Sequence, residues 1–273
     1  FVLIKLVTPS LLLQHKGFDL IDFTVVPEVK VRRLDTYEAF TQMVQGLVDI
    51  PPRDQQFWKF EGRLNGSSRP SFAVRAPTTE RATVEKVFFL QPKVVETLQI
   101  FVHRSLPGSE RMMQPRRQMS VVSSSMDGDM ASVLLFFKVY HPATTQLNII
   151  GLQIVSVETA ISDLNAFVIS LVPELGADTT FDVYEEVCHS MLTELNSSLT
   201  VSDADLGDGD VLVFQAKRRG PQNATRTRTR NGFGAINDFD LQPPCPTATS
   251  YSHFMVLKQT VKFCHLAQTS KIV

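Results

Sequence analysis

Four aspartates cluster at one point in the second half of the chain. Asp203, Asp205, Asp208 and Asp210 lie within eight residues, with glycines between them that allow a sharp turn. Carboxylates held this close raise one another's proton affinity, and an incoming lysine or arginine side chain relieves their repulsion. The spacing alone is typical of a solvated loop that closes a hairpin. A binding site for basic protein segments is the alternative, which the acidic background of this part of the chain favours, whereas the spacing fails the calcium-binding EF-hand pattern.

The cysteines and histidines of the sequence do not have the spacing of a catalytic or metal-binding site. Cys188 and His189 are sequence neighbours, and adjacent side chains on a strand point to opposite faces, so a thiolate–imidazole pair is not expected. The remaining candidate zinc ligands lack the close paired spacing of structural zinc sites; they are Cys245, His253, Cys264 and His265. No glycine-rich phosphate-binding loop is present. We therefore expect no catalytic residue, no metal and no cofactor.

Charge is distributed unevenly along the 273 residues, although the net charge is only −1. Residues 133–215 contain twelve acidic residues and a single basic one, Lys138, whereas residues 216–273 contain nine basic and two acidic residues. The acidic segment should attract basic peptides and repel nucleic acid. The basic segment, which includes Arg226, Arg228 and Arg230, is hypothesised to fold back onto it and compete with external peptides. No apolar run is long enough to span a bilayer, so no membrane partner is expected.

The first 105 residues have the pattern of a small sheet with one helix. Apolar residues recur at helical spacing after a cap at Asp35 or Thr36. Strands are predicted at residues 2–7, 25–34, 55–60 and 94–103.

Residues 132–215 repeat this plan. A helix is predicted after a cap at Thr159, and strands are predicted at residues 133–140, 147–155, 181–187 and 211–215. The order ββαβ…β, found twice, is that of the ubiquitin-like β-grasp, an α+β fold. Residues 106–131 and 216–252 lack periodicity and are predicted to be flexible linkers.

Several motifs in fixed order strengthen this assignment. Residues 134–142, 147–151, 184–187 and 208–215 resemble the C-terminal ubiquitin-like (ICP-zero-binding) region of the herpesvirus-associated ubiquitin-specific protease and its plant relatives. The first domain of that region is similar in another set of residues: 15–19, Phe57-Trp58, Arg63, Asn65-Gly66 and Arg69-Pro70. Residues 254–264 resemble the start of its third domain.

The resemblance implies tandem ubiquitin-like domains that form the docking region of a cysteine deubiquitinase. The expected division is a first domain at 1–105, a linker at 106–131, an acidic partner-binding domain at 132–215, a basic linker at 216–252 and a truncated third domain at 253–273. In this family the second domain binds a viral ubiquitin ligase and lysine-rich cellular segments, and residues 208–210 fall in the partner-binding loop.

The expected partners are therefore ubiquitin ligases, ubiquitinated substrates with Lys/Arg-rich segments, and a catalytic domain upstream in the same polypeptide. The docking region would support protein deubiquitination and control of protein stability. A stand-alone ubiquitin-like scaffold or adaptor without linked protease activity is the alternative. Three scattered cysteines fit a reducing compartment, so the nucleus and cytosol are the expected locations.

Overall fold

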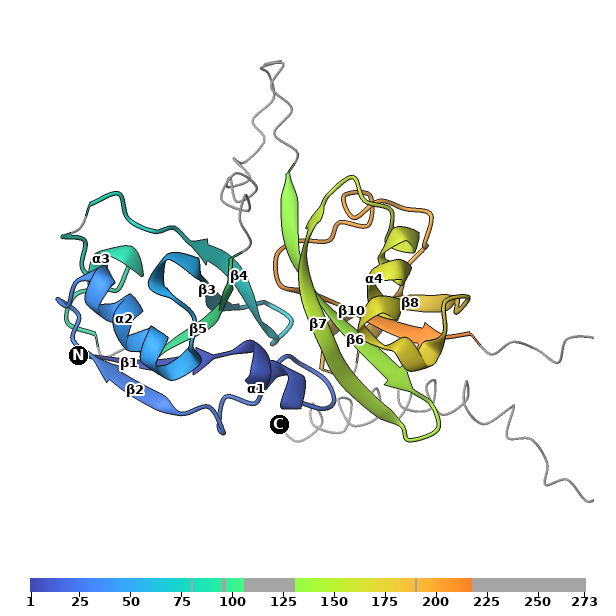
Figure 1. Cartoon of the computed structure of the whole chain (residues 1–273), viewed down its shortest axis with the longest axis horizontal. Coiled ribbons are helices and arrows are strands. Elements are labelled where there is room, and N and C mark those ends of the chain that lie inside the picture. Colours follow the sequence, from blue (N-terminus) through green and yellow to red (C-terminus); the bar gives the residue numbers. More distant parts are fainter. Residues whose placement is uncertain (80, 95–96, 106–130, 190, 218–273) are drawn as a thin grey trace, which may run out of the picture.

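The described part of the chain forms two five-stranded mixed sheets. The structure, a computed structural model, describes residues 1–79, 81–94, 97–105, 131–189 and 191–217. The first sheet is built from residues before 105 and the second from residues after 131 (Figure 1). Both mix strands with short helices, which confirms the predicted α+β class.

The first sheet has the strand order of a β-grasp. Its elements are β1 (Val2–Val7), α1 (Pro9–Gln14), β2 (Glu28–Val31), α2 (Tyr37–Val48), the 3₁₀ helix η1 (Pro52–Asp54), β3 (Gln55–Gly62), β4 (Ser68–Val74), α3 (Val84–Val87) and β5 (Thr97–Arg104). The order across the sheet is β2-β1-β5-β3-β4, in which β1 is antiparallel to β2 and parallel to β5. Thr36 caps α2, since its Oγ1 accepts a hydrogen bond from the Ala39 N–H at 3.2 Å.

The second sheet repeats this topology. Its elements are β6 (Ser132–His141), β7 (Gln146–Ser156), the 3₁₀ helix η3 (Ile161–Asp163), α4 (Leu164–Leu171), the 3₁₀ helix η4 (Pro173–Leu175), β8 (Phe181–Cys188), β9 (Met191–Glu194) and β10 (Asp210–Ala216). The order is β7-β6-β10-β8-β9. The prediction that Thr159 caps the helix is wrong, because the chain first forms η3 and α4 begins at Leu164.

Each sheet packs one face against its own helix and the other face against the other sheet. Phe40 and Val44 of α2 lie in the core of the first unit, and Leu164 and Val168 of α4 lie in that of the second. Helices α2 and α4 lie on the outer sides and the sheets meet between them, whereas α1 lies between the units beside β7 (Figure 1). The core between the sheets consists of Val7, Leu12, Leu20, Ile21, Val26, Trp58, Phe60, Phe101, Leu134, Phe136, Ile149 and Val211.

Strand β6 explains how the two units are held together. Leu135 and Phe137 point to the helix side, and Leu134 and Phe136, on the opposite face, point to the first sheet. The continuous apolar run 133–137 is therefore the signature of a strand buried on both faces.

The two linkers, apart from Ala131, Ala216 and Lys217, and the third unit at 253–273 lie outside the described residues, and the predicted domain boundaries stay predictions. Within the described ranges, no helix combines the length and the apolar character needed to cross a bilayer.

Candidate partner-binding site

The four aspartates of the acidic cluster lie in the loop between β9 and β10 and at the start of β10. Asp203 and Asp205 are exposed on the surface. The Asp203 N–H donates to Thr200 Oγ1 at 3.0 Å, which shapes the loop, and Asp205 adopts a left-handed backbone with φ 54°. Both side chains are exposed and accessible to a partner, although Asp203 Oδ2 also accepts a hydrogen bond from the Thr200 N–H at 3.5 Å.

Asp208 and Asp210 have internal hydrogen bonds as well. Asp208 Oδ1 accepts from the Leu134 N–H at 2.8 Å, and Asp210 Oδ2 accepts from the Gly207 N–H at 2.7 Å. The Asp210 side chain is 7% exposed. These two residues therefore position the loop against β6, in addition to any contact with a partner.

Arg63, from the hairpin between β3 and β4, reaches the acidic loop from the first unit. Its Nη1 donates to Asp210 Oδ1 at 2.5 Å and its Nη2 donates to the Asp208 carbonyl at 3.0 Å. At the same hairpin, Asn65 Nδ2 donates to the Val187 carbonyl at 2.7 Å. The site thus combines residues of both units, although they are more than a hundred positions apart in the sequence.

Gly209 lies where the acidic loop contacts strand β4. Its φ is +85°, and a Cβ atom there would lie 2.9 Å from Arg69 Cβ and 3.2 Å from the Pro70 carbonyl oxygen. Only glycine fits this conformation and this distance without a shift of the backbone. The sequence pattern predicts only a turn at this glycine, and the structure adds the contact between the units.

Glu185 of β8 extends the acidic cluster. Burial raises the pKa of its carboxyl group, the nearby charges of Asp210 and Asp205 raise the pKa further, and Arg63 lowers it. These charges interact at short range, so Glu185 belongs to the same electrostatic site as the loop.

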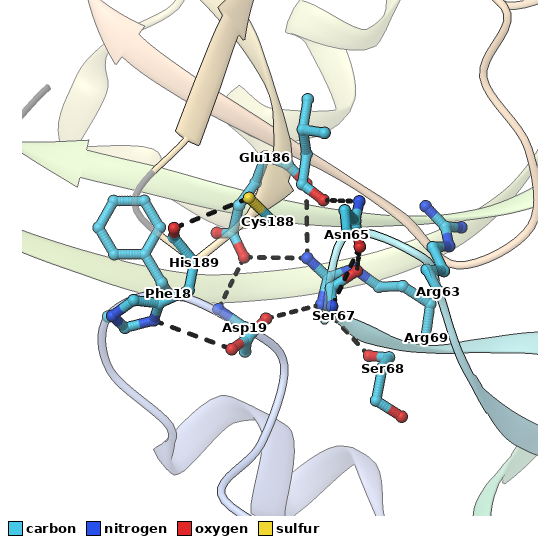
Figure 2. A network of polar contacts seen from close by, with 12 residues as sticks. Phe18, Asp19, Arg63, Asn65, Ser67, Ser68, Arg69, Glu186, Cys188 and His189 are labelled. Carbon is cyan, nitrogen blue, oxygen red and sulfur yellow. Dashed lines mark hydrogen bonds and ion pairs between the residues drawn. The ribbon is translucent and has the colours of Figure 1, made fainter. Parts of the chain in front are cut away.

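A second group of charges, which we call the buried network, connects the two sheets next to this site. It consists of Asp19, Arg69, Lys138 and Glu186, and Figure 2 shows Arg69 between Asp19 and Glu186. Arg69 Nη1 lies 3.0 Å from Asp19 Oδ1, and its Nη2 lies 3.2 Å from Glu186 Oε1. The side chains of Arg69, Lys138 and Glu186 are 0% exposed. Glu186 is therefore unavailable to a partner.

Lys138 is the cation at the centre of this network. Its Nζ donates to Glu186 Oε2 at 2.6 Å and to the carbonyls of Gly17 and Asp19 at 2.8 and 2.5 Å. Burial lowers the pKa of Lys138, and the Glu186 carboxylate raises it. The only basic residue of the acidic segment thus contacts the loop after α1 and is not presented to solvent.

Cys188 is the last residue of β8, and His189 follows it directly. The Cys188 Sγ donates a hydrogen bond to the backbone carbonyl of His189 at 3.8 Å (Figure 2). Among the described residues, no three His, Cys, Asp or Glu side chains are grouped closely enough to hold a metal ion. Cys245, His253, Cys264, His265 and the arginines at 226–230 lie outside the described residues.

Sequence reasoning missed the contributions of Arg63, Arg69 and Lys138 to this region. Arg63 and Arg69 appeared only as motif residues, and Lys138 only as the exception in an acidic segment. The available signal was the apolar run 133–137, which requires cover on both faces of β6 and therefore a second packing unit.

Comparison with known proteins gives one family and several relatives. The family described as the ICP0-binding domain of ubiquitin-specific protease 7 matches residues 55–272. Ubiquitin carboxyl-terminal hydrolase 5 of Schizosaccharomyces pombe is 20% identical over 222 residues, which is 79% of this chain and 19% of that protein. Two proteins of Arabidopsis thaliana are also similar. Ubiquitin C-terminal hydrolase 13 is 21% identical over 202 residues and ubiquitin C-terminal hydrolase 12 is 22% identical over 213 residues, each match covering 72% of this chain and 17% of the relative. The chain thus spans less than a fifth of the length of these relatives.

Proposed function

Because the chain belongs to the family of ICP0-binding domains of ubiquitin-specific protease 7, as its motifs predict, we propose that it is the partner-docking region of a ubiquitin-specific cysteine protease. It binds Lys/Arg-rich segments of target proteins through the acidic loop. The family match supports this role, because it includes the whole second sheet and the loop.

The proposal rests on a group of carboxylates in the loop before β10, at the start of β10 and on the neighbouring strand β8. Asp203 and Asp205 are exposed, and the charges of Asp210 and Asp205 add to burial in raising the pKa of Glu185. An incoming ammonium or guanidinium group relieves this repulsion and forms charge-assisted hydrogen bonds.

The docking region contributes to deubiquitination by raising the local concentration of the target, and it takes no part in the chemical step. A target bound at the acidic loop is held at high local concentration near a catalytic domain of the same polypeptide. Ubiquitin ligases and ubiquitinated substrates are the proposed partners, the nucleus and cytosol are the proposed locations, and no catalytic step is assigned to this chain.

The test is titration of the whole chain with a peptide of alternating lysine and serine residues at low and moderate salt. The Asp203→Asn/Asp205→Asn variant removes two exposed carboxylates that do not pack between the sheets, so it should fold normally and bind about tenfold more weakly at low salt. The Glu38→Gln/Glu174→Gln variant, which removes the same charge elsewhere on the surface, should bind like the parent. Equal binding by the parent and the aspartate variant would remove the loop from the site.

A further inference from the structure

We propose that Arg63 is an internal competitor at the acidic loop: its guanidinium occupies the position on Asp208 and Asp210 that a basic side chain of a partner would take, and so limits the affinity for basic segments. This inference rests on the proposed function and names a regulator of the same site. The first unit would thereby set the strength of docking on the second.

The geometry of Arg63 is that of a bound ligand. It makes two hydrogen bonds to the loop, one to the Asp210 carboxylate and one to the Asp208 carbonyl. The loop thus already binds a cationic side chain, which shows the chemistry that the site accepts. A partner's arginine or lysine would have to displace this guanidinium or bind beside it.

Arg63 is more exposed than Arg69, the arginine of the buried network nearby. The Arg63 side chain is 28% exposed, whereas that of Arg69 is 0% exposed and lies between Asp19 and Glu186. Displacing Arg69 would break its ion pair with the buried Glu186 carboxylate and leave that carboxylate with fewer partners, which is costly. Displacing Arg63 moves a surface side chain into water, so exchange with a partner is feasible.

The hairpin that carries Arg63 is held by contacts that do not involve its side chain. The Asn65 side chain binds the Val187 carbonyl, the Arg63 N–H donates to the Ser67 carbonyl, and Gly209 packs against Arg69 and Pro70. Loss of the guanidinium should therefore leave the hairpin and the acidic loop in place.

Electrostatics gives the direction of the effect. Arg63 acts on Glu185 together with the carboxylates of Asp205 and Asp210, so its positive charge lies inside the field that attracts a basic peptide. Removing it makes the site more negative and frees Asp210 Oδ1 for a partner. Binding of basic peptides should become tighter, and the gain should shrink as salt is added.

The test compares three variants of the whole chain in titration with the lysine–serine peptide. Arg63→Gln should bind about three- to tenfold more tightly than the parent at low salt. Arg63→Lys keeps the charge but loses the planar fork that makes both hydrogen bonds, so its affinity should lie between those of the parent and Arg63→Gln. Arg53→Gln removes the same charge from an arginine that is 87% exposed and paired with Asp54, and it should bind like the parent.

A second measurement needs no charge-removing variant. In the parent, the NMR signal of the Arg63 side-chain N–H, assigned with Arg63→Lys, should move toward that of a free guanidinium as peptide is added. A signal that stays unchanged at saturation would overturn the competition.

The outcomes separate the two proposals. If Arg63→Gln binds equally or more weakly while Asp203→Asn/Asp205→Asn still loses affinity, the internal competitor is disproved and the docking site stands. If the parent does not bind the peptide, or if the aspartate variant binds equally well, the proposed function fails and the inference fails with it.

Discussion

Lys138 shows, at the scale of single residues, how the two units depend on one another. Its ammonium group is buried, and three of its partners come from two segments: Glu186 of the second unit and the carbonyls of Gly17 and Asp19 in the first. A buried ion pair is costly to desolvate, and it becomes strongly destabilising when one partner is removed. The buried network therefore favours this one arrangement of the sheets over others.

We predict that Lys138→Met destabilises the chain by about 3–5 kcal/mol, because Glu186 is left as a buried carboxylate with fewer partners. The Lys138→Met/Glu186→Gln double variant should lose less than the sum of the two single variants. Urea unfolding of the parent, both single variants and the double variant measures this coupling. Strictly additive losses would show that the two side chains do not interact.

His103 provides a pH-dependent contribution to stability. Trp58 Nε1–H donates to His103 Nε2 at 3.0 Å, so this nitrogen carries no proton, and burial lowers the pKa of the imidazole. Below a pH of about 6.5 the unfolded chain takes up a proton on this histidine before the folded chain does. The free energy of unfolding therefore decreases as the pH is lowered, until the folded-state pKa is reached.

We expect this loss to approach about 1.4 kcal/mol per pH unit at most. The measurement is urea unfolding at roughly pH 7.5 and pH 5.5 for the parent and for His103→Gln, which still offers an acceptor to Trp58. The parent should lose more stability than the variant between the two pH values. The same loss in both would assign the pH effect to other groups.

At the scale of elements, the acidic loop is shaped by strand β4 of the other unit. Gly209 and Gly66 both have positive φ values, +85° and +82°, but a Cβ would contact Arg69 and Pro70 only at Gly209. Alanine variants at the two glycines therefore separate the free-energy cost of a strained backbone from the cost of the contact between the units.

Gly66→Ala should cost about 1 kcal/mol, from the left-handed backbone alone, and Gly209→Ala should cost about 3 kcal/mol, because the contact is added. Urea unfolding of both variants measures the difference. Equal losses would mean that the loop can move away from β4 without cost.

The sequence predicted the elements with a strong apolar pattern and missed the others. The main strands of both sheets and helix α2 were found because apolar residues recur in them at regular spacing. α1, α3 and β9 are only four to six residues long, and β4 contains Pro70 among polar residues, so none of them has a clear period. The strand predicted at 25–34 was too long, since β2 covers only Glu28–Val31.

The acidic loop was located from the sequence, but its surroundings were not. The contacts of Asp210 with Arg63 and of Glu186 with Arg69 join residues more than a hundred positions apart. Local spacing carries no information on which distant side chain lies opposite. The packing of one sheet on the other was needed to place them.

At the scale of the whole molecule, the two sheets share a hydrophobic core. Leu134, Phe136, Ile149 and Val211 of the second sheet are buried only because the first sheet covers them. A fragment of residues 131–217 would expose these side chains and remove two acceptors of Lys138. Exposed apolar faces of this kind promote association.

We predict that this fragment self-associates in sedimentation experiments and unfolds at lower urea concentration than the whole chain. The addition of a fragment of residues 1–105 should reduce the association, because it covers the same face. A monomeric fragment with the stability of the whole chain would contradict the role of the interface.

The burial of Lys138 has a consequence for covalent modification. Ubiquitin is attached to the ε-amino group of lysine, and Lys138 is the single lysine between residues 133 and 215. Since its side chain is 0% exposed, this stretch presents no accessible amine to an enzyme that forms isopeptide bonds. A ubiquitin ligase docked on the acidic loop would find no accessible acceptor lysine on the second sheet. Any ubiquitin chain that it builds must therefore start on a lysine outside this sheet.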